Sequence, residues 1–464
     1  MAGAEGNLEF GRRLAGRVGP TPGQAIAWLG AFLAIVLWVW MAADAAGMAL
    51  VIAVQVAFVV VALWRVALAV ASLGPKPVVE LPDRLPRYTI LAALHDEPAV
   101  AAQLVRRLEA IDYPPDRLEG YLLLETGDEA TRAALEAARP PPWLRILIVP
   151  PGAPKTKPRA LNVGLALATG QLATVYDAED EPHPQQLKEA AARFAADRES
   201  RLGCLQAPLR IRPAIGAPHG FLGRQFAVEY ASLFEVVLPG LARLHLPFPL
   251  GGTSNHFRVE ALRGIGGWDP WNVTEDADMG FRLWRAGWRL GVLNSPTWEA
   301  PPRDLHDWLP QRTRWLKGFM QTWGVHTREP WRLGPRGFFA LVMTLGVSLG
   351  SAAVHAPSLA LVISAVLVAV HARVAPATPL FAMSVLVLGV AAAWLSGAIG
   401  AQRAKTAYTA TDMLCSPAYW SLLSLACLHA IWALIQEPFH WDKTRHEPDA
   451  HQGHVPDEAG RRAA

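Results

Sequence analysis

The chain has 464 residues, of which 52% are hydrophobic, 18% are charged and three are cysteine, and its formal net charge is +3. Three distant cysteines exclude a disulfide framework and a cysteine-based zinc site, and scattered basic residues without a long Lys/Arg run exclude a nucleic-acid-binding protein. The length and the apolar fraction favour one catalytic domain joined to a membrane region.

The N-terminal part predicts two membrane crossings. A polar segment with three arginines precedes two apolar stretches, at about Ala25–Ala43 and Met48–Leu73. Each stretch is long enough to cross a bilayer. Arginines before the first crossing predict a cytoplasmic N-terminus, so two crossings return the chain to the cytoplasm near Gly74. We therefore expect a cytoplasmic tail at residues 1–23 and two transmembrane helices at residues 24–74.

The middle of the chain predicts an α/β fold. From about Arg87 to Leu293, short apolar runs alternate with amphipathic helical patterns. Pro158–Ala168 predicts a helix that ends before Gly170. Acidic clusters follow directly after strands, where open α/β sheets bind ligands. The missing glycine fingerprint disfavours NAD and ATP sites. The expected strands are Tyr88–Leu94, Tyr121–Leu124, Leu144–Val149 and Leu172–Tyr176.

After Trp331 the chain is apolar again and predicts further crossings. With the first two crossings they make about six, followed by a cytoplasmic tail at residues 437–464. Arg403 and Lys405 would then face outward, against the positive-inside tendency. Alternatively, the last stretch is re-entrant. The expected crossings are Phe338–Ala353, Leu359–Val374, Leu380–Ile399 and Met413–Leu434.

An acidic turn follows the predicted strand Leu172–Tyr176, with the sequence Asp177-Ala178-Glu179-Asp180. Alternating carboxylates at a strand end can hold a hard divalent cation, which would neutralise a departing diphosphate. We expect Asp177 and Glu179 to be the metal ligands, with Asp180 as the alternative to Glu179. A solvated acidic turn would explain the same residues without a ligand.

Two further motifs open predicted helices. Thr274-Glu275-Asp276 begins a helix that runs to Arg285, and a threonine cap with acids in the first turn is an ordinary structural pattern. Gln311-Arg312-Thr313-Arg314-Trp315 lies in a second amphipathic helix, which Pro310 can open at its first position. An interfacial helix with a basic and aromatic face would also show this second pattern.

The ordered set of motifs resembles the membrane-embedded family-2 glycosyltransferases, which include cellulose, hyaluronan and chitin synthases. The resemblance covers about Arg87 to Trp323 and rests on an Asp-x-Asp-like turn, Thr-Glu-Asp and Gln-x-x-Arg-Trp. It implies a GT-A-like cytoplasmic domain with a mixed sheet at residues 75–302, amphipathic interface helices at residues 303–332, and about four transmembrane helices at residues 333–436.

The resemblance also implies roles for single residues. Asp276 would be the general base that deprotonates the acceptor hydroxyl, a role that contributes ~10²–10⁴ in rate. Trp315 would stack on the acceptor sugar. Asp128, or alternatively Glu125, would read the nucleotide base. The implied donor-binding residues are Glu125, Asp128, Lys157, Asp177, Glu179, Gln311 and Arg314, and the implied acceptor-binding residues are Glu275, Trp315, Gly252 and Thr253.

The tail carries an aromatic, a threonine and basic groups directly after the last apolar stretch. Processive members of the family have a similar gating loop, so Trp441 and Thr444 are the candidate gating residues. A juxtamembrane basic anchor with an interfacial tryptophan is the alternative.

The expected function is inverting transfer from a UDP-sugar, with UDP-glucose the favoured donor and Mg²⁺ or Mn²⁺ as cofactor. The product would be a β-linked polysaccharide passed across the bacterial inner membrane, with membrane lipids and an accessory export protein as partners. The alternative is transfer of one sugar to a lipid acceptor. A polymer needs a channel, for which Ser416, Tyr419, Trp420 and His429 are candidate lining residues. A transporter or receptor with a non-catalytic domain is a further alternative; it would release no UDP, and substitution of Asp276 would change no turnover.

Overall fold

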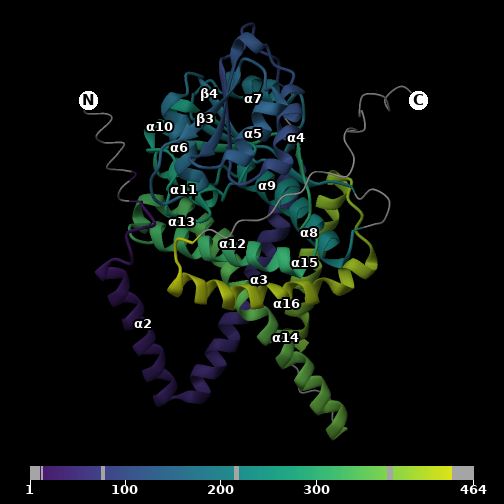
Figure 1. Cartoon of the computed structure of the whole chain (residues 1–464). Coiled ribbons are helices and arrows are strands. Elements are labelled where there is room, and N and C mark those ends of the chain that lie inside the picture. The colour runs from purple at the N-terminus through teal and green to yellow at the C-terminus, as the bar shows by residue number, and fades with distance from the viewer. Residues whose placement is uncertain (1–10, 12–13, 75–78, 214–218, 374–379, 441–464) are drawn as a thin grey trace.

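The computed structural model describes residues 14–74, 79–213, 219–373 and 380–440, together with Gly11. An α/β domain lies at one end of the molecule, and long apolar helices extend from its other end (Figure 1). Between the two lie shorter helices that run along the base of the α/β domain.

A seven-stranded mixed sheet forms the centre of the α/β domain, in the order β3-β2-β1-β4-β8-β6-β9. The first four strands are parallel, β8 is antiparallel to both neighbours, and β9 is parallel to β6. The carboxyl ends of β1, β2 and β4 therefore meet at one edge. The strands are β1 Tyr88–Leu94, β2 Leu118–Glu125, β3 Leu144–Val149, β4 Leu172–Tyr176, β6 Leu202–Gln206, β8 Asn255–Arg258 and β9 Arg289–Val292.

A second sheet of three short strands has the order β5-β10-β7. Its strands are β5 Glu181–Pro182, β7 Leu209–Ile211 and β10 Thr297–Glu299. The helices of the α/β domain are α4 Pro98–Glu109, η1 Pro115–Arg117, α5 Glu129–Ala138, α6 Lys157–Leu167, α7 Gln186–Ala195, α10 Val259–Gly264 and α11 Glu275–Arg285. The base is formed by α8 Phe221–Ser232, η2 Leu233–Val237, α9 Leu238–Arg243 and α12 Leu305–His326.

The predicted strands agree closely with the sheet. Three of them are confirmed residue for residue, and β2 is longer than predicted because Leu118 to Gly120 also pair with β1. The helix α6 begins one residue before the predicted Pro158, and α11 follows Thr274 as predicted. Long apolar runs predict buried parallel strands well, because both faces of such a sheet are covered.

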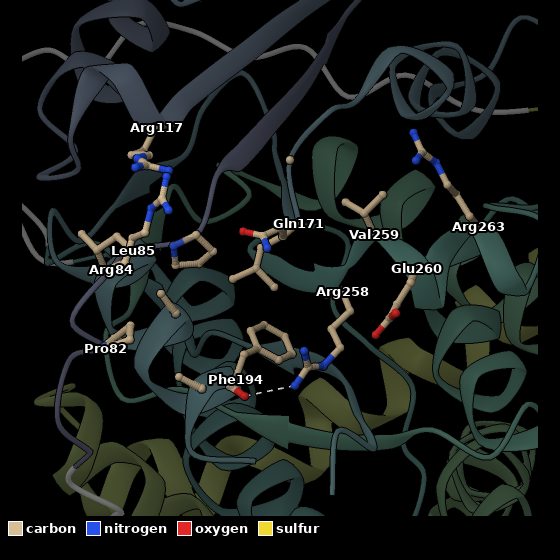
Figure 2. A pocket seen from close by; sticks show the side chains of 15 residues that line it. Pro82, Arg84, Leu85, Arg117, Gln171, Phe194, Arg258, Val259, Glu260 and Arg263 are labelled. Atoms are coloured by element: carbon tan, nitrogen blue, oxygen red, sulfur yellow. Dashed lines mark hydrogen bonds between the residues drawn. The ribbon is translucent and has the colours of Figure 1, made fainter. Parts of the chain in front are cut away.

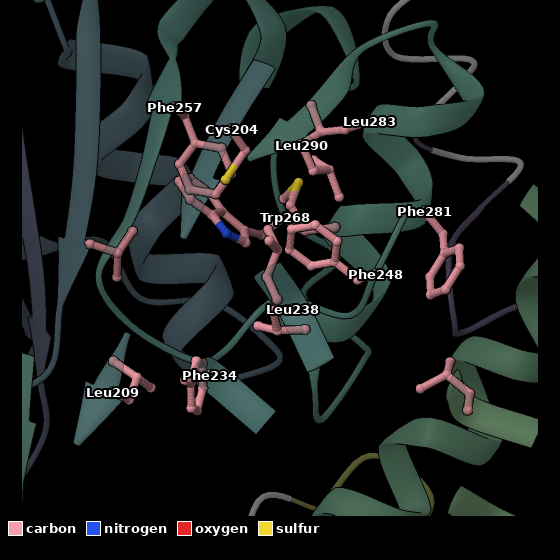
Figure 3. Packing of buried hydrophobic residues seen from close by; sticks show 14 of the residues in the cluster. Cys204, Leu209, Phe234, Leu238, Phe248, Phe257, Trp268, Phe281, Leu283 and Leu290 are labelled. Atoms are coloured by element: carbon pink, nitrogen blue, oxygen red, sulfur yellow. The ribbon is translucent and has the colours of Figure 1, made fainter. Parts of the chain in front are cut away.

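Two apolar clusters pack against opposite faces of the sheet, since successive side chains of a strand point to opposite faces. On β1, Leu91 belongs to one cluster and Ile90 to the other. Figure 3 shows the first cluster, in which Phe257 packs edge-on against Trp268 with ring centroids 5.8 Å apart. Burying one large apolar side chain contributes ~1.5–3 kcal/mol, so these clusters hold the sheet edge in place.

Five helices of the described chain are long and apolar enough to cross a membrane. They are α2 Pro22–Met41, α3 Ala43–Ser72, a run of helical elements from Pro330 to Ala372, α15 Leu380–Ala404 and α16 Ala410–Gln436. The run consists of η3 Pro330–Leu333, α13 Gly334–Leu341, η4 Val342–Gly346 and α14 Val347–Ala372.

Among the described residues, five helices have the length and apolar composition of a crossing, against the about six crossings predicted. The predicted stretch Phe338–Ala353 and the described part of the next one, Leu359–Ala372, belong to one helical run, so in the described chain three long apolar helices follow the α/β domain where about four were predicted. Pro357 lies inside this helix and does not end it. Proline disturbs the hydrogen bonds of the preceding turn. Here α16 supplies a substitute, because Ala356 N donates to Ser424 Oγ at 3.1 Å.

This correction changes the position of Arg403. Its guanidinium donates to Ser72 Oγ at 3.0 Å and to the carbonyl of Glu235 at 2.5 Å. Ser72 ends α3, and Glu235 lies in η2 at the base of the α/β domain. Arg403 thus lies on the side of the α/β domain, which removes the conflict with the positive-inside tendency.

Both ends of α16 lie against the base of the α/β domain. Asp412 near its start pairs with Arg224 of α8 at 2.8 Å, and the carbonyl of Glu437 after its end accepts from Lys317 of α12 at 3.2 Å. Figure 1 shows α16 running below α12 and across α3. This arrangement favours the alternative in which the last apolar stretch does not cross the membrane.

The helix α12 begins earlier than predicted. Asp304 is its cap and accepts from Asp307 N at 3.0 Å, so Pro310 lies inside the helix and does not open it. A carboxylate cap bonds a free backbone donor and is therefore the stronger start signal.

Candidate active site

A cavity of about 210 Å³ lies at the edge of the sheet where β1, β2 and β4 end. The start of α11 and one face of α12 form its other wall. Its lining includes a charged group around Asp177 and Lys157 and a group of rings formed by Tyr230, Phe234 and Trp315, which we call the polar end and the aromatic end. Its predicted lining residues are Glu125, Lys157, Asp177, Glu179, Gly252, Thr253, Glu275, Asp276, Gln311, Arg314 and Trp315. The structure therefore gathers motifs that lie far apart in the sequence.

The acidic turn after β4 is held by arginines through its backbone. The carbonyl of Glu179 accepts from Arg107 at 2.9 Å and from Arg212 at 2.8 Å. Both guanidiniums also bind Glu181 Oε2, each at 3.1 Å. These hydrogen bonds fix the backbone of the turn, and the side chains of Asp177 and Glu179 line the cavity.

Glu179 and Asp180 have different surroundings. Glu179 lines the cavity, whereas Asp180 is fully buried and accepts from the backbone N–H of Asp177 at 2.7 Å and from Thr253 Oγ1. Burial and the nearby Asp177 raise the pKa of Asp180 to about 8. Asp180 therefore stabilises the turn, and the geometry favours Glu179 over Asp180 as the second carboxylate toward a ligand.

The carboxylates of this turn fit a cation. Among the described residues, no three His, Cys, Asp or Glu side chains are already arranged as metal ligands. Two carboxylates suffice where phosphate and water supply the other ligands. Asp180 Oδ1 is buried without a hydrogen-bond partner in the described chain, so the turn keeps a free acceptor oxygen. Lys157 Nζ bonds Asp177, so a positive charge already lies at the place where a cation would bind. Burial and the turn's carboxylates hold the pKa of nearby Glu299 well above its usual range.

The second motif lies at the first turn of α11. Asp276 Oδ1 accepts from Ala277 N at 2.8 Å, and a Cβ atom at Gly252 would lie only 3.3 Å from Asp276 Oδ2. Glycine at position 252 therefore leaves the approach to this carboxylate open. Burial raises the pKa of Asp276, and burial together with Asp276 raises the pKa of Glu275 to about 7.

Thr274 connects α11 to α12. It occupies the cap position of α11, but its side chain makes no capping hydrogen bond, so capping does not explain this threonine. A Cβ atom at Gly318 of α12 would lie 2.1 Å from Thr274 Oγ1. The glycine allows the two helices to approach closely, and this contact sets the position of Asp276 relative to α12.

The third motif divides between two environments. Gln311, Arg314 and Trp315 lie on one face of α12 and line the cavity, as the helical spacing of three and four residues requires. The Trp315 ring stacks near Tyr230 with centroids 6.2 Å apart. Arg312 points away, forms two 2.8 Å bonds to Glu229, and lies 4.4 Å from the Trp315 ring centroid.

Of the two candidates for reading the base, only Glu125 lines the cavity. Glu125 ends β2 and accepts from Arg159 Nη2 at 2.8 and 2.6 Å. Asp128 instead caps α5, accepting from Thr131 N at 3.2 Å and from Asp96 N at 2.5 Å. The expected preference for Asp128 is therefore not met by the geometry. Trp441 and Thr444 lie outside the described residues.

Two further features of the cavity did not enter the sequence predictions. Tyr230 and Phe234 line its aromatic end beside Trp315. With Phe226 they form a stripe with a spacing of four residues, a pattern that would have indicated one helical face. Glu299, the last residue of β10, also lines the cavity. A strand of only three residues is too short to give a sequence pattern that would have indicated Glu299.

A larger hollow of about 890 Å³ lies at the amino ends of β1 and β4 (Figure 2). Its lining includes four arginines and one acid, Glu260, but none of the motif residues. Arg258 donates to the carbonyl of Phe194 at 3.0 Å, and Arg263 donates to that of Ala168 at 2.7 Å. These guanidiniums hold backbone groups in place, so we assign the hollow no chemistry.

Known proteins share this sequence pattern and this fold. A beta-monoglucosyldiacylglycerol synthase of Synechocystis is 28% identical over 51% of this chain and 48% of its own length. A cellulose synthase catalytic subunit (UDP-forming) of Komagataeibacter sucrofermentans is 27% identical over 54% of this chain and 33% of its own length. The chain thus spans half or less of these relatives.

The fold itself has a solved counterpart. The mannosyltransferase PcManGT from Pyrobaculum calidifontis, in complex with GDP-Man and Mn²⁺, superposes with a TM-score of 0.54 at 16% identity, covering 84% of this chain and 99% of that one. The likeness confirms the GT-A-like fold. The model of the glycosyl transferase family group 2 matches residues 173–435, which is more than half of the chain. The chain therefore belongs to glycosyl transferase family group 2, as its motifs predicted.

Proposed function

We propose that the chain is an inverting hexosyltransferase that moves a sugar from a UDP-sugar to a hydroxyl at the membrane face. The observation that carries this proposal is the single cavity that collects a carboxylate pair, Asp276, a basic group and an aromatic platform from four segments of the chain. The charged groups of the cavity suit the diphosphate of the donor, and the aromatic groups suit the acceptor.

The polar end would bind the donor. Asp177 and Glu179 would hold Mg²⁺ or Mn²⁺, which supplies positive charge next to the diphosphate. Arg314 offers a planar, permanently charged donor fork for the same group. Lys157 bonds Asp177 and the carbonyl of Gly252 at 2.7 Å, so its ammonium lies beside the metal ligands and can contact phosphate.

Asp276 would remove the proton of the acceptor hydroxyl. A general base works best when its pKa lies near the working pH, and burial moves the pKa of Asp276 in that direction. The alkoxide character that develops on the acceptor oxygen then attacks the anomeric carbon from the side opposite the diphosphate. One displacement of this kind inverts the anomeric centre.

The aromatic end supports a lipid as the acceptor. Tyr230, Phe234, Trp315 and Phe319 line it together with Leu233. All come from α8, η2 and α12, the helices between the α/β domain and the apolar helices. An acceptor with a hydroxyl head and an apolar body would place the hydroxyl at Asp276 and its apolar part against these rings.

Polysaccharide synthesis is the second candidate, supported by the relationship to a cellulose synthase subunit. The expected channel residues speak against it. Tyr419 OH donates to Glu229 at 2.6 Å, Ser416 Oγ accepts from Trp394 Nε1 of α15 at 3.1 Å, and the Trp420 ring packs on His355. These side chains therefore connect helices to one another.

The test is nucleoside diphosphate release by the purified protein in lipid vesicles with and without diacylglycerol, across several nucleotide sugars with Mg²⁺ or Mn²⁺. We expect release that needs the lipid hydroxyl, a radiolabelled product that is extracted into organic solvent, and loss of both in Asp276→Asn. A product of high molecular weight would overturn the lipid acceptor in favour of the polymer. Release from no donor would overturn the proposed function.

A further inference from the structure

Glu299 is a buried acid of the cavity that no motif accounts for. Only 8% of its surface is exposed, and it lines the same cavity as Asp177 and Asp276. Within the described chain, no hydrogen bond to its side-chain oxygens occurs. Glu125, by comparison, meets Arg159 at 2.6 Å. Arg212 is the opposite charge near it, but the Glu299 carboxyl oxygens keep their hydrogen-bonding capacity for a group that enters the cavity.

The backbone around Glu299 is held firmly. β10 pairs with β7, so that Glu299 lies opposite Ile211, and the carbonyl of Glu299 accepts from Arg212 N at 2.9 Å. The Arg212 guanidinium also donates to the carbonyls of Trp298 at 3.2 Å and of Glu179 at 2.8 Å. One arginine therefore ties the strand of Glu299 to the metal-binding turn, and the carboxyl is presented by a rigid element.

Glu299 lies between the two ends of the cavity. Its charged neighbours are Asp180, Glu179 and Asp177 of the turn and the guanidinium of Arg212, and it also lies near Tyr230 of the aromatic end. A sugar joined to a diphosphate at the turn, with its anomeric carbon toward an acceptor at Trp315, has its remaining hydroxyls in this intermediate region. Carboxyl oxygens accept hydrogen bonds from hydroxyl groups and complement them well.

We propose that Glu299 binds a hydroxyl of the transferred sugar and thereby determines which nucleotide sugar the protein uses. This inference rests on the proposed function and deepens it by naming a specificity-determining residue. The physical reason is that a site built around a buried hydrogen-bonding group rejects a sugar that leaves the group unpaired. Epimers that differ at one hydroxyl are the donors that such a residue would separate.

The experiment compares wild type, Glu299→Gln and Glu299→Ala on UDP-glucose, UDP-galactose, UDP-N-acetylglucosamine and GDP-mannose. Measured are kcat and KM for nucleoside diphosphate release, and the Mn²⁺ concentration for half activity. We expect kcat/KM for the best donor to fall roughly 10- to 100-fold, while kcat/KM for poor donors changes little. The ratio of kcat/KM between the best and the poor donors should therefore decrease. The half-activating Mn²⁺ concentration should stay unchanged.

The control is Glu260→Gln, the same change at the acid of the arginine-lined hollow, which should leave the donor preference as it is. Because the preference is a ratio within each variant, it is insensitive to the fraction of folded protein. An equal loss for every donor would overturn the inference in favour of a structural role, and a shifted Mn²⁺ requirement would overturn it in favour of a metal ligand. In both cases turnover by wild type leaves the proposed function standing, whereas no wild-type turnover with any donor overturns both.

Discussion

The polar and the aromatic ends of the cavity are stabilised in opposite ways. At the polar end, Asp177, Glu179, Asp180 and Glu299 lie close together, and burial, followed by their mutual repulsion, raises the pKa of Asp180 and of Glu299. At the aromatic end, Trp315 is enclosed by neighbouring rings and by Arg312, whose charge is already paired with Glu229. The polar end is therefore incomplete without a ligand, whereas the aromatic end is complete without one.

This difference has a physical consequence for ligand dependence. Bringing like charges together costs free energy that a cation and a diphosphate can offset on binding. Packed rings gain dispersion and burial energy whether or not a substrate is present. Changes at the polar end should consequently depend on metal and pH, and changes at the aromatic end should depend on the acceptor alone.

The largest effect is expected for Asp276→Asn. The amide keeps the size of the side chain but cannot accept the proton, so kcat should fall by ~10²–10⁴. The KM for the donor should change little, because the phosphate-binding residues remain. Steady-state release of nucleoside diphosphate measures both constants. A variant with near wild-type kcat would show that another group is the base.

Asp177→Asn should weaken the polar end through the metal. Loss of a partner behind a metal ligand costs about 10–100-fold in affinity, so loss of a ligand itself should raise the half-activating Mn²⁺ concentration at least about 100-fold. Titration of activity with Mn²⁺ after treatment with a chelator measures this. An unchanged titration curve would remove Asp177 from the metal site.

The pH dependence of activity should follow the raised acids beside the base. Burial and the neighbouring Asp276 raise the pKa of Glu275 to about 7, so below pH 7 kcat/KM should fall by up to about tenfold per pH unit as the two acids gain protons. A flat profile between pH 5 and 8 would contradict this assignment.

The free energy of unfolding should decrease as pH rises, whereas activity should increase. An acid whose pKa is higher in the folded state than in the unfolded state favours folding while it is protonated, and this contribution is lost as pH rises through the folded pKa. For Glu275 and Asp180, the free energy of unfolding should therefore decrease between about pH 4.5 and 8. Thermal unfolding without metal or donor measures this, and added Mn²⁺ with a nucleoside diphosphate should reverse it.

The smallest effect is expected at the aromatic end, from Trp315→Ala. One aromatic contact contributes ~0.5–1.5 kcal/mol, so the KM for the acceptor should rise up to about tenfold, with the donor KM and the metal requirement unchanged. Trp323→Ala, on the same helix but outside the lining of the cavity, is the matched control. A comparable change in the Mn²⁺ requirement would break the distinction between the two ends.

Local patterns predicted the sheet and the motifs well. The strands Tyr88–Leu94 and Leu172–Tyr176 are continuous apolar runs, and burial on both faces selects such runs whatever the surrounding chain does. Asp177, Asp276 and Trp315 were found because each belongs to a short motif with a fixed order. Asp128 and Glu125 could not be separated in this way, because both follow the same strand and only the fold shows which side chain caps a helix.

The membrane region was predicted less well, for a related reason. Hydropathy detects apolar length, but it does not detect whether a proline ends a helix or whether a helix crosses the membrane. Pro357 is tolerated because Ser424 of α16 supplies a hydrogen bond, and α16 lies along the base of the α/β domain because its two ends bind α8 and α12. Both outcomes depend on partners more than 60 residues away in the chain.

The sequence by itself determined the family, the four parallel strands β1 to β4 and the candidate chemical groups of the site, because hydrophobic periodicity and short motifs are local properties. Only the tertiary structure decided which carboxylates face the cavity and which stabilise a turn, how α16 lies, and that Glu299 joins the site. These features arise from contacts between distant segments, above all the arginine that links β10 to the acidic turn. The order of residues along the chain contains no direct record of such contacts.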